Sequence, residues 1–308
     1  MKFNIAFSRY FRLGAIISSI LVILSLFQIF VRGINFGVDF KGGAEIQVKF
    51  TEEVSTEDLR QTVEEAGISS SQVVALGEAS DHEFMIKVAA TEENINEVSD
   101  SIAGMLERSF SQEGVEIRKT DIVGPKAGKE LRTAGFLAMF WAMLAIMIYI
   151  GLRFDFKYAP GVVFAVIHDV IIVIGIFSLM GREFSLQIVG ALLAVIGYSV
   201  NDTVVIYDRV REHELKLSSG QPMDKIINRS LNETLTRTIL TSSTTLFVAL
   251  SLMIWGGGVI QDFFFAVTLG LIFGTSSSLF VASPITIWID GVMAKKAKKN
   301  EAALTRSS

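Results

Sequence analysis

The sequence predicts an α-helical membrane protein with six transmembrane helices and one extracytoplasmic α+β domain between the first two. Half of the 308 residues are hydrophobic and only 19% are charged. The mean hydropathy is +0.48, which is too apolar for a soluble globular protein. Several apolar runs approach the roughly 20 residues that span the hydrocarbon core of a bilayer. A polar stretch between the first two runs has instead the composition of a soluble domain.

The N-terminal segment 1–32 carries the first predicted span. Lys2, Arg9 and Arg12 precede an apolar run over residues 13–31. The charge pattern is that of a signal peptide, but the run is long and no small-x-small cleavage site follows it. We therefore expect an uncleaved helix whose basic end lies in the cytoplasm.

Residues 33–133 are predicted to form the extracytoplasmic domain. Strands are expected at 44–50, 72–76, 83–88 and 115–123, with helices at 55–66, capped by Ser55 and stopped by Gly67, and after the capping box at Asn94. The order β-α-β-β-α-β is the split βαβ pattern of ferredoxin-like domains, a fold that hosts many functions. Glycine and proline near 35–37 and 124–125 favour a hinge at each joint.

The bundle itself is expected over residues 134–290. Spans are predicted at 134–152, 159–179, 185–206, 238–256 and 263–289. The short connection after the second span, the longer one after the fourth, and the tail 291–308 are basic. The positive-inside rule therefore places both termini in the cytoplasm and the domain outside.

Small residues recur at helical spacing in two spans. Gly270 and Gly274 form a small-xxx-small motif, and Gly190, Ala194 and Gly197 repeat the pattern in the fourth span. Such faces let helix backbones approach closely, so we expect them to be buried in the bundle.

Several classes of function are disfavoured by composition. The chain has no cysteine, and its three histidines are far apart in sequence without metal-ligand spacing. It lacks a glycine-rich phosphate loop, and a net charge of −4 without a basic patch gives no indication of nucleic-acid binding. We expect no catalytic residues, metal or cofactor, and we do not expect an enzyme.

Asp202 is an acidic residue inside the fourth apolar run. A carboxylate at that depth costs roughly 2.5–3.5 kcal/mol to insert, so it usually faces a partner, a cavity or an ion path. Tyr198 and Ser199 precede it at helical spacing, and Asn201 is adjacent. We predict that these groups form a polar face around the carboxylate.

Two further spans carry ionisable groups at comparable depth. Arg237 opens the fifth span, with Thr241 one turn further on, and His168 and Asp169 lie inside the third. Arg237 also fits a helix-end arginine that reaches the headgroups, and His168 with Asp169 also fits a satisfied structural pair. Burial disfavours an ionised aspartate and a nearby arginine favours it. Such a group can load and release a proton, as a relay in a transporter requires.

The sequence resembles the SecF family of the bacterial SecDF protein-export machinery, within the RND transporter superfamily. The matching segments are residues 37–43 (GVDFKGG), 168–169 (HD), 196–212 (IGYSVNDTVVIYDRVRE), 230–243 (SLNETLTRTILTS) and 270–283. They follow the family's order and spacing over nearly the whole chain. The resemblance implies a subunit that uses the proton gradient to assist preprotein export in the bacterial inner membrane.

The resemblance also implies partners and residue roles. It implies SecD, the SecYEG channel, YajC and YidC as partners, besides the preprotein and the lipid bilayer. Asp202 would be the intramembrane carboxylate and Arg237 its cationic counterpart. Asp39, Gly42 and Gly43 belong to the family's motif after the first span, which we interpret as structural because glycine permits a tight turn. SecD is absent from this chain, so its residues in the pathway must come from a partner.

Two other functions remain open at this stage. One is a proton-coupled exporter of a small molecule or lipid from the same superfamily, which would need an apolar cleft in its outer domain. The other is a membrane scaffold whose intramembrane charges are structural. Proton flux separates the scaffold from the two transporters.

Overall fold

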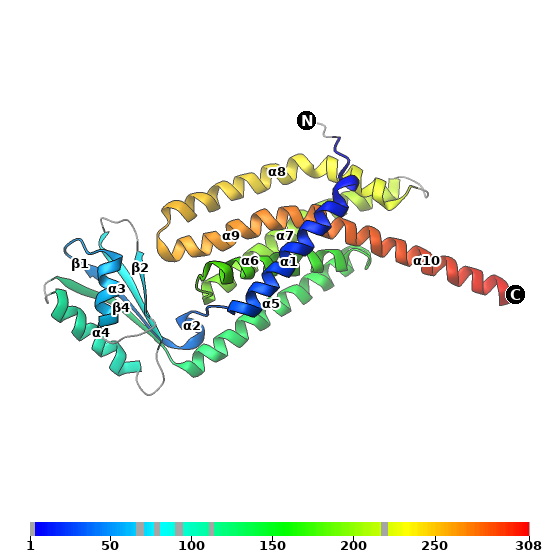
Figure 1. Ribbon diagram of the computed structural model, residues 1–308. Helices are drawn as coiled ribbons and strands as arrows, with labels where there is room; N and C mark the ends of the chain where they lie inside the picture. The colour runs from blue at the N-terminus through cyan, green and yellow to red at the C-terminus, as the bar shows by residue number, and fades with distance from the viewer. Residues whose placement is uncertain are drawn as a thin grey trace.

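The computed structural model of the chain describes residues 4–65, 71–76, 81–89, 95–110, 114–216 and 221–307. A helical bundle carries a small α/β domain at one end, and both chain termini lie at the opposite end (Figure 1). We call these the domain end and the tail end of the bundle.

The bundle is built from α1 (Phe7–Arg32), α5 (Pro125–Arg153), α6 (Ala159–Met180), α7 (Leu186–Lys216), α8 (Met223–Trp255), α9 (Gly258–Ser277) and α10 (Ser283–Ser307), with a π-helical turn over Ser278–Ala282 between the last two. By length and composition, six helical segments among the described residues can cross a membrane, one of which runs from α9 into α10. The predicted spans coincide with these segments. The chain is therefore a membrane protein of several apolar helices.

Most helices extend beyond the predicted spans. Proline suits the first turn of a helix and the residues after it are mostly good helix formers, so α5 begins at Pro125 rather than at 134. Residues 125–133, assigned to the domain from sequence, thus belong to α5. Likewise, the tail from residue 291 continues α10 as far as Ser307.

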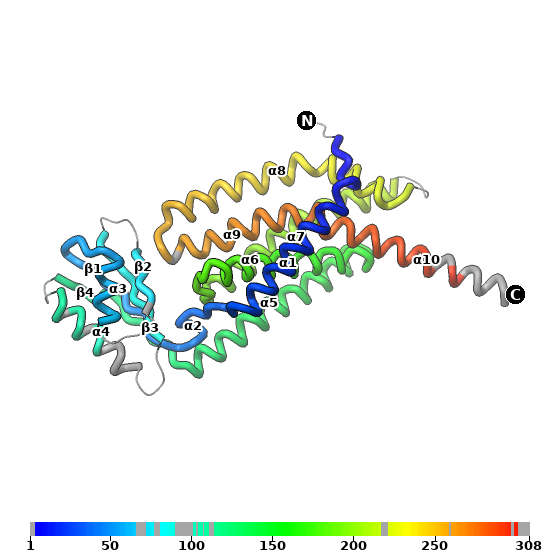
Figure 2. The backbone as a smooth tube through the Cα atoms, viewed as in Figure 1, coloured from blue at the N-terminus to red at the C-terminus, as the bar shows by residue number. Residues whose placement is uncertain are grey.

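The helices differ strongly in how much of their surface the chain itself covers. In an apolar stretch of 18 residues in each helix, 61% of the residues of α6 and 56% of those of α7 are buried. The corresponding shares are only 6% in α1 and 11% in α8. Thus α6 and α7 form the centre of the bundle, and α1 and α8 present most of their apolar surface to lipid or to another protein. In Figure 2, α8 and α9 run side by side as an antiparallel pair.

The domain is a four-stranded antiparallel sheet with two helices. Its elements are β1 (Gly43–Phe50), α3 (Thr56–Glu65), β2 (Ser71–Leu76), β3 (Glu83–Ala89), α4 (Ile95–Phe110) and β4 (Val115–Val123), and the strand order is β2-β3-β1-β4. Alternate residues of β1 are fully buried with α3 and α4 in a single core, as the period-2 pattern predicts. The backbone N–H of Asp58 donates to Ser55 Oγ at 3.0 Å, so Ser55 caps α3. Gly67 and Asn94 lie outside the described residues.

Candidate functional site: buried carboxylates in the bundle

The carboxylate of Asp169 joins three helices of the bundle. It lies on α6 with 1% of its surface exposed. Its Oδ1 is 2.9 Å from His168 Nδ1, and its Oδ2 accepts hydrogen bonds from Ser199 Oγ of α7 at 2.7 Å and Ser277 Oγ of α9 at 2.9 Å. Both oxygens are therefore engaged, which offsets part of the cost of burying the group.

Glycines on α9 permit this close approach. A Cβ atom added at Gly274 would lie 3.1 Å from Ser199 Cβ and 3.5 Å from Asp169 Oδ2, and one at Gly270 would lie 2.2 Å from a methyl of Val195. The predicted small-xxx-small face of this span is therefore in contact with α7. It brings Ser277 within hydrogen-bonding distance of Asp169.

Asp202 forms a second buried site one helical turn from Ser199. Only 3% of Asp202 is exposed. Ser242 Oγ of α8 donates to its Oδ2 at 3.4 Å, and the Ser242 and Thr275 hydroxyls are 2.9 Å apart. The two carboxylates thus lie on adjacent central helices and are both held by hydroxyl groups.

The pairing of Arg237 with Asp202 that the family resemblance implies stays a prediction. Among the described residues, no ion pair joins Arg237 to Asp202, and the side chain that bonds to the Asp202 carboxylate is Ser242. Arg237 is exposed on α8. Thr241 Oγ1 donates to the Arg237 carbonyl oxygen at 2.9 Å rather than to a carboxylate. In the chain alone, the cation faces out of the bundle.

The polar face predicted around Asp202 is only partly assembled. Ser199 is buried but bonds to Asp169 instead. The Tyr198 hydroxyl is buried without a hydrogen-bond partner in the described structure, and Asn201 is exposed. The helical spacing of Ser199 and Asp202 on α7 gives no information about the neighbouring helix. It therefore could not show that the Ser199 hydroxyl bonds to Asp169 of α6.

Sequence reasoning missed the hydroxyls that contact the two carboxylates from other helices. Ser242 and Ser277 are such residues, and Thr275 bonds to the Ser242 hydroxyl. Their signal was the run of serine and threonine in two apolar spans, since hydroxyls there are available to bond across helices. The runs do not indicate which member faces which carboxylate.

The face with Gly190, Ala194 and Gly197 on α7 is exposed, and the expectation that it is buried is wrong for this chain by itself. A Cβ atom added at either glycine would meet nothing within 4 Å. The opposite face of α7, with Ile188, Leu192 and Val195, packs into the core and determines the orientation of the helix.

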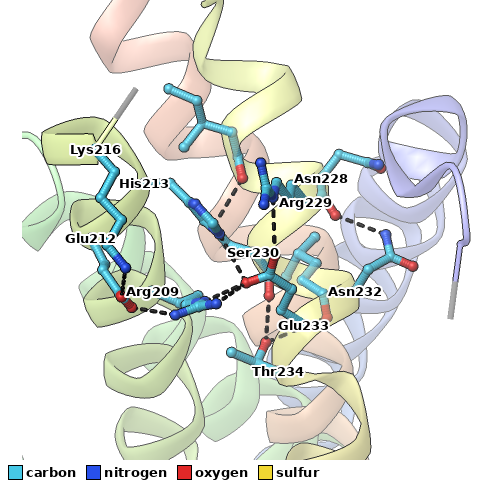
Figure 3. Close-up of polar contacts among 12 residues, drawn as sticks. Arg209, Glu212, His213, Lys216, Asn228, Arg229, Ser230, Asn232, Glu233 and Thr234 are labelled. Carbon is cyan, nitrogen blue, oxygen red and sulfur yellow. Dashed lines mark hydrogen bonds and ion pairs between the residues drawn. The ribbon is translucent and has the colours of Figure 1, made fainter. Parts of the chain in front are cut away.

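An ionic cluster ties the tail ends of α7 and α8 together (Figure 3). The Glu233 carboxylate pairs with Arg209, with His213 Nε2 at 2.9 Å and with Arg229 Nε at 3.0 Å. Asn232 makes two hydrogen bonds to the backbone of Ile5, at 2.7 and 2.9 Å, and so anchors the chain before α1. Because Arg237 follows Glu233 by one helical turn, this cluster fixes the position of the α8 segment that bears the arginine.

The segment 37–43 fastens the domain to the bundle. The backbone N–H of Leu186, at the start of α7, donates to Asp39 Oδ2 at 3.0 Å. Gly42 has φ +87° and Gly43 has φ +154°, and a Cβ atom would lie 2.6 Å from Pro125 Cα at the first and 2.1 Å from the Val88 carbonyl oxygen at the second. Both glycines are therefore required by backbone conformation and by close packing.

We expect Gly43→Ala to lower the free energy of unfolding by more than about 2 kcal/mol, because the new methyl meets backbone that cannot yield. Gly104→Ala is the matched control, since nothing lies within 4 Å of its added Cβ atom on α4; it should be neutral or stabilising by up to about 1 kcal/mol. Thermal unfolding in detergent measures both. Equal stability of the two variants would contradict the packing argument.

A charged joint links the sheet to the connection between α6 and α7. Lys87 Nζ of β3 lies 3.0 Å from Glu183 Oε2 and 3.2 Å from Glu45 Oε1, and Glu183 also accepts the Val38 backbone N–H at 3.2 Å. The parallel bridge between Phe36 and Phe184 lies beside it. The hinge predicted near residues 35–37 is thus held by several bonds in this structure.

The joint has a pH dependence of defined sign. Burial lowers the pKa of Lys87, but the charges of Glu183 and Glu45 outweigh burial and raise that pKa above its ordinary value of 10.5. Burial raises the pKa of Glu45 above 4.5, against the opposing charge of Lys87. A raised folded-state pKa contributes stability that is lost as the pH rises through it. The Glu45 contribution is therefore lost above pH 4.5, whereas that of Lys87 persists to above pH 10.5.

We expect the domain to stay fixed to the bundle through neutral pH and to loosen above a pH of about 10.5. The chain has no native cysteine, so spin labels at Glu52→Cys and Ile254→Cys can report the width of the distance distribution. Lys87→Met should broaden it already at pH 7 and remove the alkaline step. An alkaline step that persists in Lys87→Met would show that other groups control the joint.

No group of three or more histidine or acidic residues among those described is arranged to hold a metal ion. The arrangement instead provides two carboxylates within apolar helices, each bonded to hydroxyls. Groups of this kind can bind and release protons inside a membrane.

Comparisons with known proteins extend over almost the whole chain. Residues 103–292 match the family described as protein export membrane protein SecD/SecF, C-terminal, and residues 29–54 match the SecD/SecF GG motif. The chain is 39% identical to the protein translocase subunit SecF of Calditerrivibrio nitroreducens, over 88% of this chain and 90% of that one. It is 37% identical to the subunit of the same name from Vibrio alginolyticus, over 88% and 85%.

Solved structures give the same result. The crystal structure of SecDF from Thermus thermophilus, described as a translocon-associated membrane protein, superposes with a TM-score of 0.78 at 34% identity. The superposition covers 96% of this chain but 39% of that one, so this chain spans about two-fifths of the SecDF polypeptide. SecDF in the form called super-membrane-facing superposes with a TM-score of 0.69.

Proposed function

The chain belongs to the SecD/SecF family of protein export membrane proteins, and from this premise we propose that it is the SecF-type half of a machine that uses the proton gradient to assist preprotein export. The observation that carries the proposal is the pair of buried carboxylates, Asp169 and Asp202, on the central helices α6 and α7. A carboxylate in hydrocarbon is costly and usually serves an ion path.

In this proposal Asp202 carries the proton and Arg237 is its switching partner. Within the described part of the chain, Asp202 accepts a hydrogen bond from one hydroxyl, at 3.4 Å, and so long a bond leaves the carboxylate able to exchange partners. Approach of Arg237 would favour the ionised form and release the proton, and withdrawal would favour reloading. His168 and Asp169 form a second site of the same proton path, and more hydrogen bonds hold it in place.

The exposure of Arg237 and of the small-residue face of α7 supports a partner that covers them. Gly190, Ala194, Gly197 and Asn201 follow one another at helical spacing on an exposed face. Small residues on a membrane helix permit close packing of another helix. We propose that SecD occupies this face, with the Sec channel, YajC and YidC associating further out.

We expect Gly197→Leu to reduce co-purification of a SecD-type partner by at least about tenfold, a loss of about 1.4 kcal/mol, because the added side chain holds the helices apart. Nothing in the chain itself lies within 4 Å of that position, so its stability should not change. Ile239→Phe, on the exposed face of α8, is the control for added bulk. Undiminished co-purification with Gly197→Leu would place the partner elsewhere.

We further propose that both termini are cytoplasmic in a bacterial inner membrane and that the domain is extracytoplasmic and ferredoxin-like. Its element order and its strand order β2-β3-β1-β4 support the fold assignment. An impermeant maleimide should label Glu52→Cys from outside intact cells and should not label Asn300→Cys. The reverse pattern would invert the topology.

The proposal as a whole is tested by reconstitution. Proteoliposomes that contain this chain, a SecD-type partner, the Sec channel and its ATPase should export a preprotein faster when a proton gradient is imposed. A protonophore should remove only the increment that depends on this chain. An increment that survives the protonophore would favour a scaffold role.

A small-molecule exporter finds less support. It would need an apolar cleft in the outer domain, but the cavity beside Phe50 and Phe110 is also lined by Glu52, Glu53 and Asp58. Such a wall suits neither a lipid nor a hydrophobic solute.

A further inference from the structure

A cavity of about 480 Å³ lies between α1, α6 and the π-helical turn, away from the Asp202 site. Its wall includes Ala15, Ser18 and Val22 of α1, Phe164 and His168 of α6, and Phe280 of the turn. Phe164 is 57% exposed, so the cavity opens towards lipid. Its size is within the range of small-molecule sites.

Two close contacts fix α1 to the bundle, one on each side of the cavity. Toward the tail end, Gly14 packs on Phe280, where an added Cβ atom would lie 2.7 Å from the Phe280 Cβ atom. Toward the domain end, Ser25 packs on Gly175, where an added Cβ atom would be 2.3 Å away. The cavity lies between these two fixed points, so the fold maintains it rather than leaving a loose surface groove.

Polar groups of α1 and α6 meet in this otherwise apolar wall. At 1.5 Å per residue, His168 lies about 14 Å from the start of α6, near the middle of a core about 30 Å thick. Ser18 lies about 8 Å inside the apolar run that begins at residue 13. Ser19 is also part of the wall. His168 is 7% exposed; its Nδ1 lies beside Asp169, and its Nε2 is buried with no hydrogen-bond partner in the described structure.

We propose that this cavity binds an isoprenoid quinone, with the ring beside Ser18, Ser19 and His168 and the isoprenoid chain along α1 and α6. Because Nδ1 donates to Asp169, the imidazolium form of this ion pair leaves its Nε2–H buried without an acceptor. A buried donor without a partner is costly, and the carbonyl oxygen of a ligand would accept from it. A phospholipid headgroup carries charge and is kept at the interface by the cost of entering hydrocarbon. A quinone is neutral, carries carbonyl oxygens on a small ring, and can stack on Phe164 or Phe280.

Occupancy would act on the bundle through His168. The ring of His168 is bonded to Asp169, whose carboxylate also holds Ser199 and Ser277. A ligand oxygen at Nε2 restrains the imidazole and, through it, the contact of α6 with α7 and α9. The site includes His168 but not Asp202, the proposed proton-carrying residue, and its occupancy can be measured without any export assay.

The test uses the full chain in lipid nanodiscs and a photoreactive azido derivative of a short-chain isoprenoid benzoquinone. Labelling should be saturable and should map to peptides of α1 and α6 that line the cavity. Ser18→Phe, which fills the cavity, should lower labelling at least about tenfold. Ile16→Phe adds equal bulk at a position on α1 that is 57% exposed and outside the wall, and it should label like the parent.

A shape-preserving variant guards against misfolding of Ser18→Phe. Ser18→Ala with Ser19→Ala removes two hydroxyls without adding bulk and should weaken binding severalfold while the melting temperature is retained. Unchanged labelling in both variants would overturn the proposal. So would labelling of the same peptides, with the same loss in Ser18→Phe, by a phospholipid that carries a photoreactive acyl chain in the same nanodiscs, because the cavity would then hold an acyl chain.

Discussion

Asp202→Asn is expected to abolish the part of preprotein export that depends on the proton gradient, while the protein remains folded in the membrane. The amide has nearly the volume of the carboxylate and can still accept from Ser242, 3.4 Å away in the parent. It cannot bind and release a proton between pH 5 and 9, however, so a relay through this position stops. Export by vesicles with and without a protonophore measures the loss.

Asp208→Asn is the matched control for this substitution. Asp208 lies on the same helix, but it is exposed, and its ion pair with Arg153 is 3.7 Å long with both side chains about half exposed. A surface pair of this kind contributes little, so export should be unchanged. If Asp202→Asn retains full gradient-dependent export, the proton does not pass through Asp202, and the electrostatic role given to Arg237 falls with it.

Asp169→Ala is expected to cause a large loss of stability in the bundle core. It removes the acceptor shared by His168, Ser199 and Ser277. Hydrogen bonds between membrane helices average about 0.6 kcal/mol each, whereas a buried group left without its partner costs about 1–3 kcal/mol. Three such donors put the loss at about 2 kcal/mol or more. Unfolding of the purified protein in mixed micelles measures it.

Ser277→Ala provides the comparison, because it removes one of the three donors and leaves the carboxylate in place. Its loss should be about 1 kcal/mol or less. Asp169→Asn, which keeps one acceptor oxygen and the shape of the side chain, should fall between them. If Asp169→Ala is no less stable than Ser277→Ala, Asp169 does not hold the three helices together, and its burial would call for another explanation.

The sequence predicted the spans well because helical apolar segments of bilayer length have a strong and local signature. All four strands of the domain were likewise visible in short alternating runs, and the register that places Ile46 and Val48 in the core follows from their period. The start of α5 was less visible, since charged residues after Pro125 are compatible with helix and with loop. Helix ends depend on solvent and on tertiary contacts that apolar periodicity does not record.

The candidate residues illustrate the limit of reasoning along a single helix. Asp169 and Asp202 were identified because a carboxylate in an apolar run is anomalous by itself. Their partners lie on other helices, at sequence separations of 30 residues for Ser199 with Asp169 and 108 for Ser277 with Asp169. No local pattern determines which face of α9 turns towards α6.

The sequence by itself determined that this chain crosses a membrane several times, that it carries a small α/β domain, and that acidic groups lie within its apolar helices. Those features depend on composition and on the periods 2 and 3.6, which act over a few residues. Tertiary structure alone decided that Ser199 serves Asp169, that Arg237 forms no ion pair with Asp202, and that the glycine face of α7 stays open. These outcomes depend on how rigid helices pack against one another, which fixes helix rotation through many distant contacts at once.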